Sequence, residues 1–272
     1  VKFKMLKHDP CGLICLCFTY LAVAYADYAV VRWILIEMIG NSIWTSIHAV
    51  SFNSLIFLLL FAHWRAVFTD PGTVPFPARK LDFSDLHSGN RASSEQKEGW
   101  TVCLKCEIYR PPRAHHCRTC NRCIRKMDHH CPWINNCVGE RNQKYFLQFL
   151  IYVGAVAFYA AGLVVYAWFG ECRDCFIESI SFQHRVVHSI ILMIESGLFG
   201  LFVVAIVIDQ VTAIFSDTTA VEQVKGDNSG RTRRPKMSHL ADVCGKGHPI
   251  LWLFPCVSVP EPLSYNNGTY EV

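Results

Sequence analysis

The longest apolar stretches of this 272-residue chain lack charged side chains and lack a polar face. The segments Leu55 to Phe61 and Leu198 to Ile208 are apolar along their whole length, whereas a surface helix of a soluble protein is amphipathic. Hydrophobic residues make up 51% of the chain, and this fraction alone would also fit one large soluble domain with buried helices. The missing polar faces exclude helices at a water-exposed surface and favour a membrane protein.

Apolar residues gather in four blocks, each near the ~20 residues that cross a bilayer as a helix. The blocks run roughly from Cys11 to Val31, Ala49 to Phe68, Tyr145 to Phe169 and Val186 to Ile208. The first block is interrupted by Asp27, and it lacks the polar region that follows the short apolar core of a cleavable signal peptide. The sequence therefore predicts an all-α multi-pass membrane protein with four transmembrane helices and a cysteine-rich region between the second and the third.

Positive charge is scarce in two of the segments between these blocks. The loop after the first block contains Arg32, and the loop from Gly170 to Arg185 balances its basic residues with acidic ones. The segment from Asp70 to Lys144 instead holds 13 Lys and Arg against 8 Asp and Glu, and both tails are basic. Because cytoplasmic segments carry the excess of Lys and Arg, we expect both termini and the cysteine-rich region in the cytosol, where the sequon Asn267 to Thr269 would stay unmodified.

The expected organisation has four parts. They are residues 1–69 with the N-terminal tail and helices 1 and 2, 70–144 with the cysteine-rich domain, 145–216 with helices 3 and 4, and 217–272 with the C-terminal tail.

Cysteine and histidine are concentrated in one window. From Cys103 to Phe146 the chain carries seven cysteines and four histidines. Thiols stay reduced in the cytosol, so a dense group of cysteine and histidine there indicates metal binding rather than disulfides. In the loop on the other side of the membrane, Cys172 and Cys175 are placed where oxidation to a disulfide is allowed.

Structural zinc takes four tetrahedral ligands and often uses short Cys-x2-Cys pairs, of which the window has two. A single zinc would leave several reduced thiols without a role, so two Cys3His sites with eight ligands are expected. The eleven candidate ligands are Cys103, Cys106, Cys117, Cys120, Cys123, Cys131, Cys137, His115, His116, His129 and His130. Three of them must be spare, and the spacing does not say which histidine and cysteine join which pair.

Cys131 is a candidate for a spare thiol. It directly follows His130 and lies three residues after Asp128. A nearby imidazole can hold a thiol as the reactive thiolate, and a carboxylate can orient that imidazole. Neighbouring histidines in an extended backbone point to opposite sides, so one can bind metal while the other faces the thiol. The alternative, that Cys131 and both histidines are ligands or packing residues, is equally open from the spacing alone.

The window resembles the cysteine-rich domain of the DHHC protein S-acyltransferases (palmitoyltransferases), with Asp128-His129-His130-Cys131 as the tetrad. Asp70-Pro71-Gly72 resembles the DPG motif of that family, and the predicted four-span layout is similar to that of the family. The resemblance covers nearly the full length of the chain. The segments His129 to Glu140 and Asn142 to Phe146 are most similar to a Golgi-type branch.

The resemblance implies a role for each residue that matches the family motif. Cys131 resembles the nucleophile, His129 the base and Asp128 the partner that orients it. One zinc would take Cys103, Cys106, His116 and Cys123, and the other would take Cys117, Cys120, His130 and Cys137. This assignment uses eight ligands and leaves His115, His129 and Cys131 spare.

The resemblance also implies the substrates and the location. Palmitoyl-CoA would donate a long-chain acyl group to Cys131 as a thioester, and the group would pass to cysteines of membrane-associated proteins on the cytosolic side of the Golgi bilayer. Trp133 and Phe146 would help to wall the acyl entry, and Val156 resembles the residue that sets chain length. A side chain smaller than an aromatic ring at Val156 should admit chains of palmitoyl length or somewhat longer.

Three features of the fourth apolar block and the C-terminal tail are unusual for a chain with this resemblance. The TTxE motif of the family reads Thr219-Ala220-Val221-Glu222 here, and the tail from Met237 to Cys244 has no asparagine where relatives carry one. Both departures predict weaker support of the site by the tail. Glu195 is an ionisable residue in the fourth block, so we expect it to meet a polar partner such as His188 or to line the site.

Other classes of function fit less well. Zinc knuckles with arginines occur in nucleic-acid-binding proteins, but this chain has neither the Cys2His2 helix spacing nor stacking aromatics, so we expect no nucleic-acid partner. A RING-like ubiquitin ligase also has two zinc ions but needs no spare thiol. The main alternative is a membrane-anchored zinc scaffold without acyl transfer, and the intact tetrad argues against it.

Overall fold

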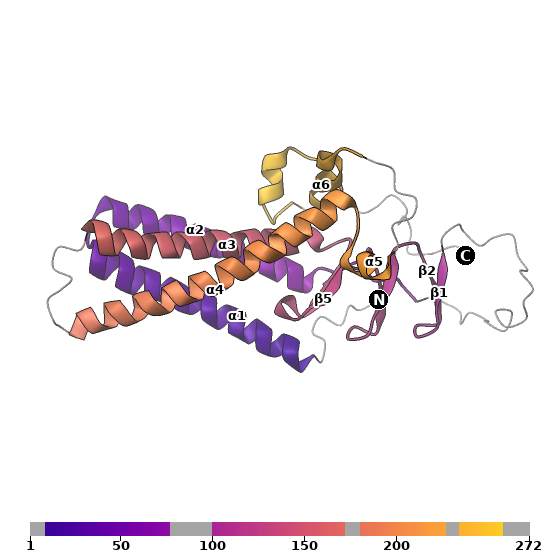
Figure 1. Cartoon of the computed structure of the whole chain (residues 1–272), viewed down its shortest axis with the longest axis horizontal. Helices are drawn as coiled ribbons and strands as arrows, with labels where there is room; N and C mark the ends of the chain where they lie inside the picture. The colour runs from indigo at the N-terminus through magenta and orange to yellow at the C-terminus, as the bar shows by residue number, and fades with distance from the viewer. Residues whose placement is uncertain (1–8, 77–99, 172–179, 227–233, 258–272) are drawn as a thin grey trace, which may run out of the picture.

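The computed structural model describes residues 9–76, 100–171, 180–226 and 234–257. Long helices lie side by side over most of the molecule, and the cysteine-rich strands lie at one end of them (Figure 1). Cys172, Cys175 and the sequon at Asn267, for which the sequence made predictions, lie outside the described residues.

Four helices among the described residues are long and apolar enough to cross a membrane. The first is α1 (Pro10–Ala29) continued by a π-helical segment, η1 (Val30–Ile39), and the third is α3 (Gln143–Tyr166) continued by η4 (Ala167–Glu171). The second and fourth are α2 (Ile43–Phe68) and α4 (Ile180–Ser216). The prediction of a multi-pass membrane protein with four membrane helices is confirmed. The first helix is longer than the predicted block because Asp27 and Arg32 continue it instead of ending it.

The helix ends follow from local sequence. Asp9 caps α1 by accepting a hydrogen bond from the backbone of Cys11, and a proline stands at the first helical position, where its missing N–H costs nothing. Gly40, with φ of 79°, ends η1 in a conformation that residues with a Cβ rarely adopt. The Ser42 side chain then caps α2.

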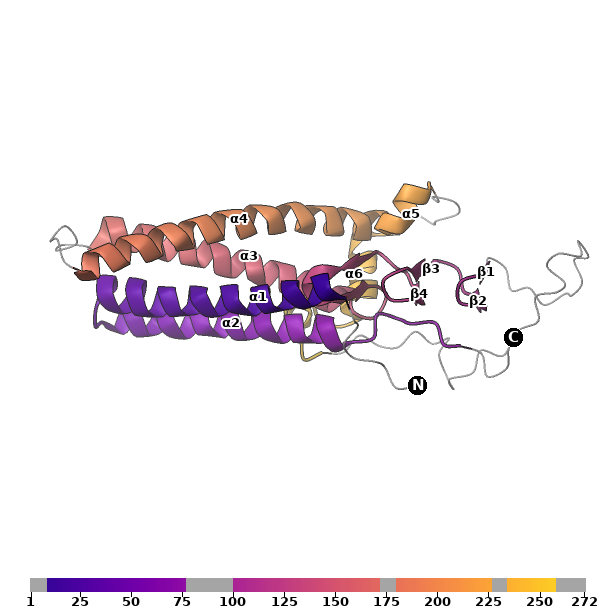
Figure 2. The same cartoon turned by 90° about the horizontal axis from the view of Figure 1, so that it is seen from below.

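The helix α3 lies at the centre of the bundle, where it packs against α2 and α4. In the most apolar 18-residue stretch of this helix, 50% of the residues are buried inside the protein, compared with 17% in the corresponding stretch of α4. In the view of Figure 2, α1 and α2 lie side by side in the lower part of the bundle, and α3 and α4 lie in the upper part. Large apolar side chains on the outer faces, such as Leu21, Phe57 and Leu201, are exposed, as expected for helices surrounded by lipid.

Between α2 and α3, the described residues form three two-stranded antiparallel hairpins. Their strands are β1 (Thr101–Cys103) with β2 (Ile108–Arg110), β3 (Ala114–Cys117) with β4 (Arg122–Arg125), and β5 (His129–Cys131) with β6 (Asn136–Val138). A short 3₁₀ turn, η3 (Pro132–Ile134), connects β5 to β6. The predicted all-α class is correct for the long helices, and the hairpins add a small amount of β structure that this class does not include.

The Asp70-Pro71-Gly72 turn joins α2 to this domain. One oxygen of Asp70, Oδ1, accepts hydrogen bonds from the backbone of Gly72 at 2.9 Å and Thr73 at 2.7 Å. The Gly72 carbonyl accepts a hydrogen bond from the backbone of Arg125 at 2.9 Å. The turn therefore fixes the cysteine-rich domain against the end of the second membrane helix.

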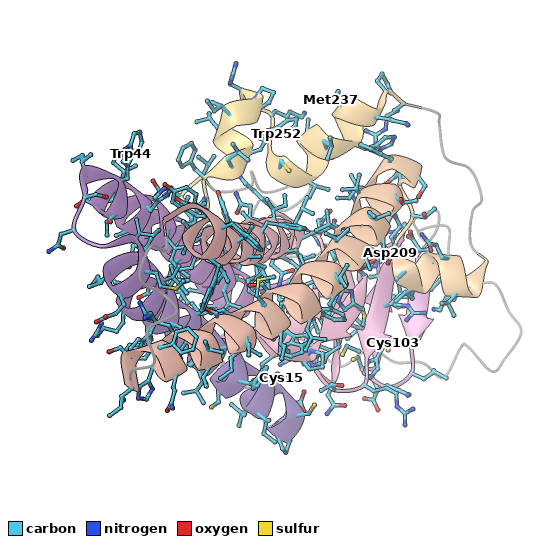
Figure 3. The ribbon with its side chains drawn as sticks, turned by 60° about the vertical axis from the view of Figure 1, so that its left-hand side comes forward. Cys15, Trp44, Cys103, Asp209, Met237 and Trp252 are labelled. Atoms are coloured by element: carbon cyan, nitrogen blue, oxygen red, sulfur yellow. The ribbon has the colours of Figure 1, made fainter. Side chains whose placement is uncertain are left out.

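The segment after α4 forms α5 (Ala220–Lys225), α6 (Lys236–Cys244) and the 3₁₀ turn η5 (Pro249–Leu253). Three α3 side chains on successive turns, Lys144, Gln148 and Tyr152, donate hydrogen bonds to carbonyls at and after η5. Figure 3 shows Met237 and Trp252 of this segment on the opposite side of the bundle from Cys15 of α1. The C-terminal segment is therefore fixed to the central helix rather than to the first one.

Candidate active site and metal sites

The described residues include two clusters that could hold metal ions. The first cluster is Cys103, Cys106, His116 and Cys123, and the second is Cys117, Cys120, His130 and Cys137. In each cluster, one ligand atom from each of the four residues lies within 4.8 Å of the others. The structure thus brings together the same two sets that the family resemblance assigns. The adjacent residues His116 and Cys117 of β3 serve different clusters because neighbouring side chains of a strand point to opposite faces.

The second cluster is ordered around the ring of His130. Its Nδ1 lies 3.4 Å from the sulfur of Cys120, 3.7 Å from that of Cys137 and 3.8 Å from that of Cys117. In the first cluster, Nδ1 of His116 lies 3.1 Å from the sulfur of Cys106. His115 belongs to neither cluster, and its Nδ1 lies 3.0 Å from Nζ of Lys225.

The carboxylate of Asp128 is buried and accepts hydrogen bonds at both oxygens. The Oδ2 atom meets Nδ1 of His129 at 2.8 Å and Nε2 of Gln210 at 2.8 Å, and Oδ1 meets the backbone N–H of Ala220 at 2.7 Å. Burial alone would raise the pKa of Asp128, but these hydrogen bonds outweigh it and hold the pKa below its usual range. The side chain is therefore a fixed, ionised partner for His129.

The ring of His129 is oriented on two sides. Its Nδ1 meets Asp128, and its ring lies at 70° to that of Phe146 with 5.4 Å between the centroids. Burial disfavours the charged imidazole, but the hydrogen bond and charge of Asp128 and the neighbouring Cys131 thiol raise the pKa of His129 to about 9. Because Nδ1 is occupied, Nε2 is the nitrogen left to exchange a proton with a reacting group.

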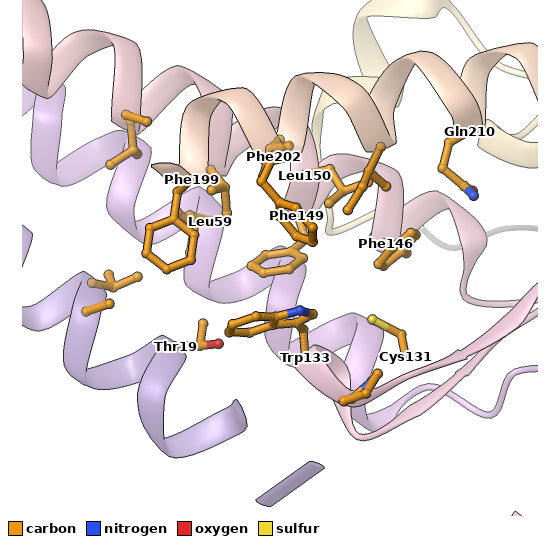
Figure 4. A pocket seen from close by; sticks show the side chains of 18 of the residues that line it. Thr19, Leu59, Cys131, Trp133, Phe146, Phe149, Leu150, Phe199, Phe202 and Gln210 are labelled. Carbon is orange, nitrogen blue, oxygen red and sulfur yellow. The ribbon is translucent and has the colours of Figure 1, made fainter. Parts of the chain in front are cut away.

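The thiol of Cys131 faces an apolar cavity of about 430 Å³. Figure 4 shows its sulfur pointing into the space beside Trp133 and Phe146. His129 and Asp128 also line this cavity. The structure therefore brings the three predicted catalytic residues to the opening of one pocket.

The pocket walls come mainly from α1, α3 and α4, and Leu59 of α2 also lines the cavity. The Trp133 ring packs near Phe18 and Phe199, with centroid distances of 6.2 and 6.3 Å, and Val156 lies in the wall formed by α3. Along α4 the lining extends from Gln210 to Glu195, a length of about 22 Å at the helical rise of 1.5 Å per residue. Such a pocket can take an extended acyl chain.

The predicted partner of Glu195 is engaged elsewhere. Nδ1 of His188 lies 3.0 Å from the hydroxyl of Tyr25, whereas Glu195 lines the pocket. Of the two expectations for Glu195, the one that places it in the wall of the site holds. Among the described residues, no hydrogen bond or ion pair joins Glu195 to His188, which lies seven residues earlier on α4 and meets Tyr25 of α1 instead.

Buried polar side chains that sequence reasoning missed hold the loop after Cys131. Nδ2 of Asn136 donates to the carbonyls of Val67 and Thr69, each at 3.0 Å, and so binds the end of α2. Nε2 of His63, on α2, lies 3.0 Å from the carbonyl of Trp133. The sequence carries little signal for these contacts, because a single histidine in an apolar block or a single asparagine among cysteines does not show which distant carbonyl it will meet.

The contact of Ala220 with Asp128 corrects the expectation of weaker support by the TTxE segment. The donor is the backbone N–H of Ala220, so loss of a threonine side chain there leaves this contact in place. The side chains of Thr219 and Glu222 form a reciprocal capping box at the start of α5, which fixes the direction of that N–H.

An arginine of the cysteine-rich domain holds α5 in position. Arg113 donates two hydrogen bonds to Glu222, at 2.7 and 3.0 Å, and one to Oδ1 of Asp217 at 2.9 Å. Glu222 is 1% exposed. This ion-pair network links the cysteine-rich domain to the segment that contacts Asp128.

A helical membrane protein with two Cys3His clusters, and with a thiol, an imidazole and a carboxylate at the opening of an apolar pocket, has the features of a membrane-bound cysteine acyltransferase. The DHHC palmitoyltransferase family model matches residues 96–227. Human palmitoyltransferase ZDHHC3 is 36% identical over 251 residues, which cover 91% of this chain and 81% of that protein. Rat palmitoyltransferase ZDHHC7 is 35% identical over 254 residues, covering 92% and 80% of the two chains. A probable protein S-acyltransferase 12 of Arabidopsis thaliana is 31% identical over 211 residues, covering 76% and 72%.

The chain belongs to the DHHC palmitoyltransferase family.

Proposed function

We propose that this protein transfers a palmitoyl or similar long-chain acyl group from acyl-CoA to Cys131 as a thioester, and then to cysteine thiols of membrane-associated substrate proteins. The observation that carries the proposal is the position of Cys131 at the opening of the apolar pocket, beside an imidazole that Asp128 orients. The pocket accommodates the fatty chain while the polar CoA stays in water. A family relationship to named palmitoyltransferases supports the same reaction.

In the first half of the reaction, Cys131 attacks the carbonyl carbon of the acyl-CoA thioester. Because the pKa of His129 is raised to about 9, its Nε2 already holds the thiol proton before the attack, and Cys131 reacts as a thiolate. A sulfur–carbon bond forms at Cys131, and the bond between the carbonyl and the CoA sulfur breaks. The CoA thiolate then leaves with the proton from the imidazolium. Asp128 remains ionised and keeps the imidazole in the tautomer with hydrogen on Nδ1.

The second half repeats the exchange with a substrate cysteine. His129 takes the proton of the incoming thiol, the acyl carbon bonds to the substrate sulfur, and Cys131 leaves as a thiolate. One thioester replaces another in each half, so the enzyme mainly supplies a thiolate, positioning and a proton carrier. A ping-pong cycle follows from this order of steps.

The two Cys3His clusters are proposed to hold structural zinc. Tetrahedral zinc with bonds of about 2.3 Å to sulfur and about 2.0 Å to nitrogen places those atoms roughly 3.5 Å apart. The separations of 3.4, 3.7 and 3.8 Å around His130 fit this geometry. A bound zinc would tie the hairpins together beside the tetrad and would take no part in acyl transfer.

A Golgi membrane is the proposed location, with the cysteine-rich domain and both tails in the cytosol. The similarity of the segment from His129 to Glu140 to a Golgi-type branch supports the organelle, and the excess of Lys and Arg between Asp70 and Lys144 supports the orientation. Substrate cysteines would then lie at the cytosolic face.

The direct test incubates purified protein with labelled palmitoyl-CoA. We expect a covalent label that hydroxylamine removes, as a thioester requires, and its loss in Cys131→Ser. Zinc content of the variant serves as the control for folding. A folded, zinc-loaded wild-type protein that takes up no label would overturn the transferase and leave the inert zinc scaffold.

A further inference from the structure

The carboxylate of Asp9 joins two parts of the molecule that are far apart in the sequence. Its Oδ1 accepts a hydrogen bond from the backbone of Cys11 at 3.2 Å and caps α1. Its Oδ2 lies 3.3 Å from Nε2 of His130 in the tetrad. Both side chains are largely buried, with 15% and 13% of their surfaces exposed. One carboxylate therefore contacts both the start of the first membrane helix and the second Cys3His cluster.

The ring of His130 is turned so that its two nitrogens have different partners. Nδ1 faces the three thiols of its cluster, so it is the atom placed to bind a metal ion. Nε2 then carries the hydrogen and faces Asp9. A histidine that binds a metal usually donates its other N–H to a carboxylate or carbonyl, which fixes the ring and strengthens the ligand.

A second contact fixes the same turn of α1. A Cβ atom at Gly12 would lie 2.3 Å from Oδ1 of Asn135, so the helix backbone packs directly on the loop that follows Cys131. From this contact α1 continues along the acyl pocket, where Thr19 and Ala26 line the wall. The start of α1 thus meets the cluster, the catalytic loop and the pocket wall.

We propose that Asp9 is a positioning residue that orients His130 in the second zinc site and fixes α1 against the catalytic loop. This inference rests on the proposed assignment of zinc to the cluster of Cys117, Cys120, His130 and Cys137. Asp9 acts on the metal ligand through Oδ2 and on the helix through Oδ1, so the two actions can be separated by substitution.

The experiment compares Asp9→Ser and Asp9→Ala in the full-length protein. Serine caps a helix about as well as aspartate, but it has a single side-chain oxygen and no carboxylate to reach His130. We expect Asp9→Ser to hold one of its two zinc ions with about 10- to 100-fold lower affinity, measured as zinc release to a chromogenic chelator. The other zinc should be released as in the wild type. Asp9→Ala should lose zinc to the same extent and should also unfold at a lower temperature, because the cap is gone.

Asp242→Ser is the matched control, since it makes the same change at an aspartate whose partner is the exposed Arg234, at 2.9 Å, rather than a metal ligand. Equal zinc release in Asp242→Ser and Asp9→Ser, or wild-type release in Asp9→Ser, would overturn the role of Asp9. Repeating the measurement in the Cys131→Ser background separates this inference from acyl transfer, because zinc binding is then read without the nucleophile. A wild-type protein that binds a single zinc or none would overturn the zinc assignment itself.

Discussion

The neighbouring histidines of the tetrad have different surroundings because β5 is extended and its side chains alternate. The ring of His129 meets Asp128 and the edge of Phe146, inside the opening of the pocket. The ring of His130 faces three thiols on one side and Asp9 on the other. Substituting each histidine in turn therefore separates proton transfer from metal binding.

His129→Ala should keep both zinc ions and lose acylation of Cys131 by about 10²- to 10⁴-fold, the usual contribution of a positioned general base. His130→Ala should lose one zinc as well as acylation, because a Cys3His site would be left with three ligands. Metal analysis of the purified variants and single-turnover labelling with palmitoyl-CoA measure the two effects. Equal zinc loss in both variants would contradict the separation of roles.

Val156 is the residue that should set the usable depth of the pocket. It is buried in the wall formed by α3, and replacing it with tyrosine adds an aromatic ring to the space between α3 and α4. We expect Val156→Tyr to shift preference from palmitoyl-CoA toward shorter acyl-CoA chains, measured by competition between donors. Val165→Tyr makes the same change at a residue of α3 that is 47% exposed, and its preference should stay at the wild-type value. A shift of equal size in both variants would argue against a pocket determinant at Val156.

At the scale of elements, α5 is the short helix on which the geometry of the carboxylate depends. Its first residue, Ala220, donates a backbone hydrogen bond to Asp128, and the position of that N–H depends on the capping box and on Arg113. Asp128 in turn orients His129. Through this backbone contact, the C-terminal segment supports the carboxylate that orients the proposed catalytic imidazole.

Arg113→Ala should lower the rate of Cys131 acylation without loss of zinc. The substitution leaves the carboxylate of Glu222 buried without this arginine, a change that costs roughly 3–5 kcal/mol for a fully buried pair and less here, because the Arg113 side chain is 24% exposed. Single-turnover rates and zinc content measure the outcome. Arg32→Ala is the control, since Arg32 pairs with Glu37 within η1, away from α5, with 44% of its side chain exposed, and exposed pairs contribute about 0–1 kcal/mol. Wild-type acylation in Arg113→Ala would contradict the role of α5.

The elements differed in how far the sequence could predict them. Hydropathy predicts the four membrane helices because a spanning segment must be apolar along about 20 residues. The resemblance of the cysteine window anticipates both Cys3His clusters and the placing of Cys131. Contacts such as those of Asp128 with Gln210 and Ala220 were not predicted, because they depend on how α4 and α5 approach the tetrad. In addition, any residue type supplies a backbone N–H, so the prediction of weaker support from the altered TTxE motif misses the contact of Ala220 with Asp128.

At the scale of the whole molecule, the reacting thiol lies where the cysteine-rich domain meets the helix bundle. The pocket that starts at Cys131 runs among the four long helices, while the clusters are formed by the hairpins at one end of the bundle. A fatty chain in the pocket would lie within the apolar layer, and CoA would stay outside it. This arrangement requires the cysteine-rich domain to be on the side of the membrane where acyl-CoA and reduced thiols are found.

Glycosylation mapping in cells tests that orientation. An acceptor segment with an Asn-x-Thr sequon, inserted between Asp174 and Cys175 in the connection of α3 to α4, should be glycosylated because this connection is expected in the lumen. The same segment inserted after Asp227 in the C-terminal tail should stay unmodified, and Asn267→Gln should leave the migration of the protein unchanged, because the proposed orientation puts that sequon in the cytosol. Mass shifts sensitive to endoglycosidase give the readout, and acylation of each variant controls for folding. A glycosylated tail would place Cys131 in the lumen, where palmitoyl-CoA could not reach it, and would contradict both the orientation and the proposed donor.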